Sequence, residues 1–260
     1  MKSACFLVLA LLAGTPAFAQ LAAPNAAGVG FGHVHINTSD IEAQKRFWAE
    51  AGGKVVQRDK MTLVEFPGGV VPLREQVPTG RAVGSTVNHI GLNVKDLQGS
   101  LAKWRADGMN VEAGVNANQW FLNGPDGLRV EILENTAIVG PVQWHHTHLF
   151  VTDYVAAQKW YADHFGGTPG KRLSFLTVMV PGSEITFSQT DMPQAPSEGR
   201  LIDHIGFEVR GLDAFVAKLQ AEGIKTDAPI RNSTLVNGLR IVYITDPWGT
   251  KIELTEGLAK

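Results

Sequence analysis

Four stretches of the chain alternate apolar and polar residues as half-buried strands do. They read HVHINTSD from His33, HIGLNVKD from His89, HTHLFVTD from His146 and HIGFEVRG from His204. Their leading histidines are 56, 57 and 58 residues apart (89 − 33, 146 − 89 and 204 − 146). This nearly constant spacing indicates an internal repeat of about 57 residues.

A helix is predicted after each of these strands. Asp40, Asp96 and Asp153 follow the first three strands, and aspartate is a favoured helix N-cap, whereas Gly211 takes that place in the fourth copy. Each helical segment then ends at glycine, which suits a left-handed C-cap. Short β-rich runs broken by Gly, Pro and Asn follow the helices. Each unit therefore reads as one strand, one helix and about three further strands, which is an α+β pattern of four βαβββ modules.

The four modules are not equally alike. The first and third share RFWAEAGG and KWYADHFGG, whereas the second and fourth share NGPDGLRVEIL and TDPWGTKIEL. This A-B-A-B order indicates that a two-module domain was doubled. We therefore expect two tandem domains, over residues 28–138 (modules 1 and 2) and 141–258 (modules 3 and 4), joined around NTAIVGPVQ.

Composition and charge restrict the partners of the chain. It has 260 residues, 44% of them hydrophobic, and 23 Lys and Arg against 25 Asp and Glu give a net charge of −2. No basic field is present to hold nucleic acid or an anionic membrane surface, so we expect a small-molecule partner.

The N-terminus has the three-part pattern of a secretory signal peptide. Lys2 precedes a short apolar run, and Ala17-Phe18-Ala19 precedes Gln20, which predicts a signal over residues 1–19 with cleavage after Ala19. Cys5, the single cysteine, lies inside this segment, so the mature chain would hold neither disulfides nor thiolate ligands. We expect an exported protein, periplasmic or secreted, with no membrane segment once the signal is removed.

Histidine recurs with the repeat. Seven of the eight histidines lie on or beside the four first strands, at 33, 35, 89, 145, 146, 148 and 204. The even-numbered modules each add an acid six residues after a proline, Glu131 after Pro125 and Glu253 after Pro247. Within the expected domains this gives one set of His33, His89 and Glu131 and another of His146, His204 and Glu253.

Two imidazoles and one carboxylate, with other positions open, suit a catalytic divalent ion such as iron(II), manganese or zinc. We expect one such ion per active domain. His148 faces the same side of its strand as His146 and is a candidate second ligand or proton carrier, whereas His145 points away. His33 and His35 likewise face one side of their strand. A single histidine on an apolar strand is more often a satisfied core residue, and a duplicated site leaves open whether both copies work.

These residues carry a family resemblance. Histidine on a first strand and glutamate on a last one, as in DHIGFEV and DPWGTKIEL, resemble the vicinal oxygen chelate superfamily of glyoxalases, extradiol dioxygenases and antibiotic-resistance proteins. The resemblance covers the whole mature chain. It implies glyoxalase-like domains in which two modules form a cup-shaped, incompletely closed sheet with the metal inside.

The resemblance implies a metal-dependent enzyme whose ion chelates a small substrate through adjacent oxygens, of the lyase and isomerase type or of the ring-cleaving dioxygenase type. VYITDPWGTKIE matches the extradiol signature and supplies Tyr243, which could bond to a substrate oxygen or simply pack in its strand. Those enzymes carry a histidine where this chain reads STLVNGL, so proton transfer would fall to His148, Tyr243 or water.

The alternative function is a binding or resistance protein that holds a small molecule without converting it. Because one chain carries all four modules, a monomer needs no partner, and a homodimer remains open.

Overall fold

The computed structural model describes residues 21–116 and 118–259, so the expected signal peptide lies outside the described residues. The four modules each contain one strand, one helix and three strands, as predicted. Module 1 comprises β1 (Val29–Thr38), α1 (Ile41–Glu50), β2 (Lys54–Arg58), β3 (Met61–Phe66) and β4 (Gly69–Glu75). Module 2 comprises β5 (Val87–Val94), α2 (Leu97–Ala106), β6 (Asn110–Ala113), β7 (Trp120–Asn123), a 3-10 turn (Pro125–Gly127) and β8 (Arg129–Glu134).

The second half of the chain repeats this order. Module 3 comprises β9 (Val142–Val151), α3 (Tyr154–Phe165), β10 (Thr168–Arg172), β11 (Phe175–Val180) and β12 (Ser183–Gln189). Module 4 comprises β13 (Ile202–Val209), α4 (Leu212–Ala221), β14 (Arg231–Asn232), β15 (Arg240–Thr245) and β16 (Lys251–Glu256).

The helix signals in the sequence act as expected. The side chain of Asp40 accepts a hydrogen bond from the backbone N–H of Ala43 at 2.9 Å, and Asp96 and Asp153 cap α2 and α3 in the same way. Glycine 211, which has no side chain to offer, precedes α4 in a left-handed conformation. Because the caps satisfy N–H groups that lack partners within the helix, they fix where each helix begins.

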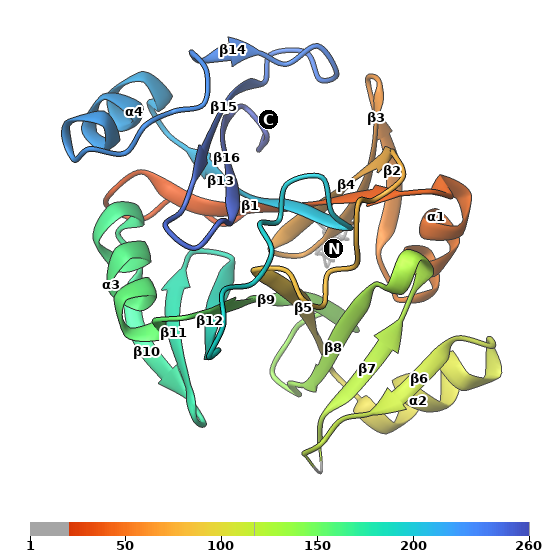
Figure 1. The fold of residues 1–260 in the computed structure, drawn as a ribbon. Coiled ribbons are helices and arrows are strands. Elements are labelled where there is room, and N and C mark those ends of the chain that lie inside the picture. Colours follow the sequence, from red (N-terminus) through yellow and green to blue (C-terminus); the bar gives the residue numbers. More distant parts are fainter. Residues whose placement is uncertain (1–20, 117, 260) are drawn as a thin grey trace, which may run out of the picture.

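The strands form two eight-stranded sheets, which do not follow the expected domain boundaries (Figure 1). The first sheet has the order β14-β15-β16-β13-β1-β4-β3-β2 and joins module 4 to module 1. The second has the order β10-β11-β12-β9-β5-β8-β7-β6 and joins module 3 to module 2. The expectation that modules 1 and 2, and 3 and 4, would each share a sheet is therefore wrong.

The chain path explains this pairing. Residues 135–141 lead from β8 directly into β9 of the same sheet, where β9 runs antiparallel to β5. The chain crosses from one sheet to the other through residues 76–86, between β4 and β5, and through residues 190–201, between β12 and β13. These two segments run beside each other and are joined by backbone hydrogen bonds, such as that from the N–H of Thr79 to the oxygen of Gly199. Because A-type and B-type modules present equivalent strands, the repeat alone does not determine which copies pair.

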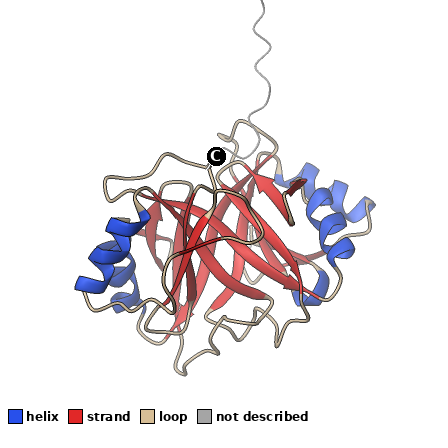
Figure 2. Cartoon of the chain, turned by 90° about the horizontal axis from the view of Figure 1, so that it is seen from above, coloured by secondary structure: helices blue, strands red, loops and turns tan. Residues whose placement is uncertain are grey.

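Consecutive modules nevertheless pack together through their helices. Indole Nε1 of Trp104 in α2 donates to the backbone oxygen of Glu50 at the end of α1, at 3.0 Å. Phe165 of α3 stacks on Phe207 of β13, with ring centroids 4.4 Å apart. The helices thus lie at the two ends of the molecule with the strands between them (Figure 2). No described helix is long and apolar enough to cross a membrane.

One continuous hydrophobic core joins the two sheets. Phe31 of β1 stacks on Trp144 of β9 at a centroid distance of 5.1 Å, and both rings are almost fully buried. The open edges are β14 and β2 in the first sheet and β10 and β6 in the second, so neither sheet closes. The α+β class and the incompletely closed sheets predicted from the sequence are confirmed.

Candidate metal centres

The register of the first sheet assembles one group of metal-binding residue types. In the antiparallel pair of β1 and β13, His33 lies opposite Gly206 and His35 lies opposite His204. Strand β16 runs parallel to β13 and places Glu253 beside Gly206. We call His33, His35, His204 and Glu253 the first site; all four are buried.

Two imidazoles of the first site converge on one oxygen. Nε2 of His33 lies 2.8 Å from Oε2 of Glu253, and Nε2 of His204 lies 3.1 Å from the same atom. On its other side the His204 ring is held by Asp203, whose Oδ1 lies 2.5 Å from Nδ1. A carboxylate that accepts from Nδ1–H orients the ring and leaves Nε2 facing the site, as the outer partners of metal-bound histidines do.

The second sheet repeats the arrangement with the other modules. His146 lies opposite Gly91 and His148 lies opposite His89, while β8 places Glu131 beside Gly91. We call His89, Glu131, His146 and His148 the second site; their ligand atoms lie within 4.8 Å of one another and all four residues are buried. Nε2 of His146 lies 3.1 Å and Nε2 of His89 lies 3.6 Å from Oε2 of Glu131.

A glycine opposite a histidine makes room for the ring in both sites. A Cβ atom on Gly206 would lie 2.0 Å from Cε1 of His33, and one on Gly91 would lie 2.1 Å from Cε1 of His146. Any larger residue would displace these imidazoles. Both strands also carry register shifts beside these pairs, and such bulges aim side chains next to functional sites.

The predicted ligand sets are corrected by this pairing. All six predicted residues lie in the two sites, but His33 is grouped with His204 and Glu253, and His146 is grouped with His89 and Glu131. The sets His33, His89, Glu131 and His146, His204, Glu253 are wrong because β1 pairs with β13 and β9 pairs with β5.

The two predicted catalytic residues lie in different sites. Tyr243 is opposite Glu253 on β15, and its ring contacts that of His204 at a centroid distance of 5.3 Å. His148 belongs to the second site, where Nδ1 lies 3.2 Å from Nε2 of His89 and Nε2 lies 2.9 Å from the Ser188 hydroxyl. In the first site the residue equivalent to His148 is His35.

The polar surroundings of the two sites differ, although their ligand types agree. Opposite Glu253 is Tyr243, whereas opposite Glu131 is Phe121. Asn88 takes the place of Asp203 and accepts at Oδ1, 2.9 Å from Nδ1 of His89. These differences follow from the strand register and were not predicted. The glycine contacts described above had a signal in the sequence, the repeated His-Ile-Gly at 89–91 and 204–206.

His145 is not simply turned away from its neighbours as predicted. Its Nδ1 lies 2.7 Å from Nδ1 of His146, so one of the two rings donates to the other. Burial, and then the neighbouring His146, lower the pKa of His145 to about 3. His145 therefore stays neutral and orients the His146 ring from outside the site. Gly32 stands at the equivalent place in β1.

Charge is distributed unequally between the sites. Burial disfavours the imidazolium of His204, but its hydrogen bonds to Asp203 and Glu253 outweigh this and raise its pKa to about 9. Burial lowers the pKa of His35 well below its ordinary value, and it also lowers the pKa of His89 and His148. In the ion-free protein His204 is thus favoured in its charged form beside a neutral His35, and an ion bound at Nε2 of His204 would displace that proton.

Burial opposes the charge on the two glutamates, but contacts with the paired histidines overcome that effect. His204 and His33 hold the pKa of Glu253 well below its ordinary value, and His146 and His89 do the same for Glu131. A second acid of the second sheet, Glu184, is occupied elsewhere: it accepts from Nε of Arg172 at 2.8 Å and from the Thr186 hydroxyl at 2.7 Å.

Several buried nitrogen atoms show that both sites fit a cation. Nε2 of His33 and of His146 lie near a carboxylate but off the hydrogen-bonding direction, and Nε2 of His35 has no hydrogen-bond partner among the described residues. Leaving a buried polar atom unsatisfied costs about 1–3 kcal/mol. In the second site the ligand atoms of three histidines and Glu131 lie within 4.8 Å of one another, and in the first site those of three histidines do, with Glu253 beside two of them, so each site could hold one divalent ion.

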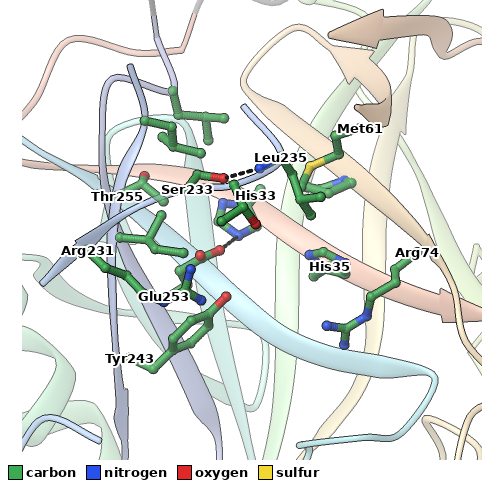
Figure 3. A pocket seen from close by; sticks show the side chains of 15 residues that line it. His33, His35, Met61, Arg74, Arg231, Ser233, Leu235, Tyr243, Glu253 and Thr255 are labelled. Carbon is green, nitrogen blue, oxygen red and sulfur yellow. Dashed lines mark hydrogen bonds and ion pairs between the residues drawn. The ribbon is translucent and has the colours of Figure 1, made fainter. Parts of the chain in front are cut away.

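A cavity of about 120 Å³ adjoins the first site (Figure 3). His33, His35, Tyr243 and Glu253 supply polar groups to it. Its remaining wall is formed by the side chains of Met61, Pro72, Arg74, Arg231, Ser233, Thr234, Leu235, Leu239, Ile241, Thr255 and Leu258. The residues 233–239, where the extradiol signature would carry a histidine, therefore lie against the site without supplying an acid or base.

Known structures share this fold over most of the chain. Glyoxalase I from Zea mays has 16% identical residues and a TM-score of 0.66, and the match covers 89% of this chain and 93% of that one. A putative dioxygenase from Bacillus subtilis has 13% identical residues and a TM-score of 0.69, covering 92% of this chain and 86% of that one. At these identities the likeness concerns the fold alone. No curated protein matches the chain in sequence.

A family model matches residues 143–254, which span modules 3 and 4, under the description Glyoxalase/Bleomycin resistance protein/Dioxygenase superfamily. The resemblance inferred from the histidine and glutamate positions is thereby confirmed, and modules 1 and 2 repeat the same βαβββ order. Residues 143–254 thus match the Glyoxalase/Bleomycin resistance protein/Dioxygenase superfamily in sequence, and the chain as a whole shares its fold with a glyoxalase I and a putative dioxygenase.

Proposed function

We propose that the protein is a divalent-metal-dependent enzyme that acts at the first site on a small molecule with two adjacent oxygens. The observation that carries the proposal is the convergence of His33 and His204 on one oxygen of Glu253, at 2.8 and 3.1 Å, where His33 and Glu253 line a cavity. The second site is proposed to bind an ion as well, without carrying the reaction.

His33, His204 and Glu253 would hold the ion, which we expect to be iron(II), manganese or zinc. Such an ion supplies a Lewis acid with free positions for two neighbouring substrate oxygens. Asp203 keeps the His204 ring oriented, and Arg74 in turn holds Asp203, with Nη2 3.0 Å from its Oδ2.

Two further side chains give the first site its proton chemistry. Burial raises the pKa of Tyr243 above its ordinary value, so its phenol stays protonated and can donate a hydrogen bond to a substrate oxygen. His35 is neutral, and its Nε2 has no hydrogen-bond partner among the described residues, so it can accept a hydrogen bond from a substrate hydroxyl. The second site has Phe121 in place of the phenol, which supports assigning the reaction to the first site.

Between the reaction types that the superfamily suggests, we favour the ring-cleaving dioxygenase type over the lyase and isomerase type. On β4 the residue beside His33 is Val70, so this strand adds no carboxylate there, and the ligand set remains two histidines and one glutamate. Two histidines and one carboxylate with open positions are typical of non-haem iron(II) oxygenases.

Metal analysis of the purified mature protein tests the proposal. After reconstitution with iron(II), manganese or zinc, His33→Ala and Glu253→Gln should lose the ion of the first site and all turnover, whereas His89→Ala should lose only the other ion. His164→Ala is a matched control, because His164 lies outside both sites and pairs with Glu222. Catechols and thiohemiacetals serve as substrates for the two reaction types.

Two results would contradict this proposal. One is a protein that takes up none of the three metals, and the other is metal uptake that persists in Glu253→Gln. Saturable ligand binding that survives a chelator, with no turnover, would instead support a binding or resistance protein of the same fold.

Export and assembly are proposed on separate grounds. Residues 1–19 have the pattern of a signal peptide, so a periplasmic or secreted mature chain should begin at Gln20, which N-terminal sequencing of the processed protein tests. One chain supplies both partners of each sheet, which supports a monomer. Light scattering on the mature protein would detect a homodimer.

A further inference from the structure

We infer that the substrate of the first site is a small, largely apolar molecule with its metal-binding oxygens at one end and a negative charge at the other, and that Arg231 binds this charge. This inference rests on the proposed function of that site. The evidence is the position of the Arg231 guanidinium on the cavity wall, its lack of a hydrogen-bond partner among the described residues, and the apolar residues around it.

Strand register places Arg231 on the face that bears the site. Arg231 on β14 lies opposite Ile241 on β15, and Tyr243, two residues further along β15, lies opposite Glu253. Because alternate residues of a strand face the same side, Arg231, Tyr243 and Glu253 line one wall of the cavity (Figure 3). Two residues of strand separate the Arg231 row from the Glu253 row, which is about 7 Å.

The two arginines of the cavity differ in their partners. Arg74 is occupied, since Nε donates to Oδ1 of Asn37 at 2.8 Å and Nη2 pairs with Asp203. Arg231 has no carboxylate or other hydrogen-bond partner among the described residues. A guanidinium matches a carboxylate with two parallel hydrogen bonds, so an unpaired arginine on a cavity wall is suited to bind an anion.

The rest of the wall indicates what lies between the metal-binding oxygens and the anion. Met61, Leu239, Ile241 and Leu258 belong to one apolar cluster and line the cavity, as Leu235 also does. The cavity volume of about 120 Å³ is close to the roughly 150 Å³ of a cavity that admits benzene. A single aromatic ring with two adjacent oxygens at one edge and a carboxylate at the other would place its oxygens at the metal ligands, its ring against the apolar residues and its carboxylate at Arg231.

The test compares three probes that share the chelating pair: 3,4-dihydroxybenzoate, its uncharged amide 3,4-dihydroxybenzamide, and catechol. Titration calorimetry of the metal-loaded protein should give binding of the acid on the order of tenfold tighter than binding of the amide, since a charged hydrogen bond contributes at least that much. In Arg231→Gln the acid and the amide should bind alike, while Arg231→Lys should keep part of the preference.

Controls separate this inference from the proposed function. Arg231→Gln should keep the metal content and the affinity for catechol, and Arg46→Gln, which removes an exposed arginine on α1, should leave all three affinities unchanged. Equal binding of acid and amide by the unmodified protein, or a preference that persists in Arg231→Gln, overturns the inference alone. Absence of metal-dependent binding of all three probes overturns the proposed function.

Discussion

The substitution Gly206→Ala should remove the metal of the first site without unfolding the protein. Gly206 lies opposite His33, and an added Cβ would stand 2.0 Å from Cε1 and 2.2 Å from Nδ1 of its ring. An ordinary contact begins at 3.4 Å, so the ring must retreat by about 1.4 Å (3.4 − 2.0). Ligand distances at a metal tolerate only about 0.2 Å, and His33 can then no longer reach an ion shared with His204 and Glu253.

The assay is metal stoichiometry by titration and elemental analysis. The unmodified protein should bind two ions, Gly206→Ala one, and Gly91→Ala, which displaces His146 in the second site, also one. Overpacking of this kind costs about 1–3 kcal/mol, which denaturant unfolding would measure. Gly140→Ala is the matched control, because its Cβ would meet nothing closer than 3.8 Å.

The two variants should also differ in activity. Gly206→Ala is expected to abolish turnover, and Gly91→Ala to preserve it, since we assign the reaction to the first site. A folded Gly206→Ala protein that still binds two ions with unchanged affinity would refute the reasoning, because it would mean that the close contact between β1 and β13 does not position His33.

Three other predictions address different parts of the molecule. Tyr243→Phe should lower kcat by roughly 10²-fold at unchanged metal content, because only a donor to the substrate is lost; steady-state kinetics checks this. Asp246 is buried and its pKa is raised, chiefly by burial, while Tyr161 donates to it at 2.8 Å. The folded protein therefore holds this proton above the unfolded pKa of 3.8, and the stability contribution of Asp246 falls as the pH rises through its folded pKa. Asp246→Asn, whose Oδ1 can still accept from the N–H groups of Trp248 and Thr250, should accordingly gain stability relative to the unmodified protein as the pH rises above 3.8, in denaturant titrations at each pH; a difference that does not change with pH would contradict the argument. Trp144→Ala should cost about 3–5 kcal/mol in denaturant unfolding, since its ring fills the contact between the sheets on Phe31; a loss below about 1 kcal/mol would mean that this contact contributes little to the core.

Local structure could be predicted from the sequence because its causes are local. Asp40, Asp96 and Asp153 begin helices by hydrogen bonds within three residues, and the alternation around His33 and His204 marks strands by a period of two. The repeat of about 57 residues therefore determined four βαβββ modules and the residue types of both candidate metal centres.

The membership of each site was decided only by the tertiary structure. Equivalent modules carry equivalent pairing edges, so the sequence is compatible with His33 beside His89 and with His33 beside His204. The crossings at 76–86 and 190–201 place β1 against β13, and this choice joins Tyr243 and Arg231 to one site and His148 to the other. Ligand types are thus a property of each strand, whereas their grouping depends on long-range strand pairing, which no local pattern encodes.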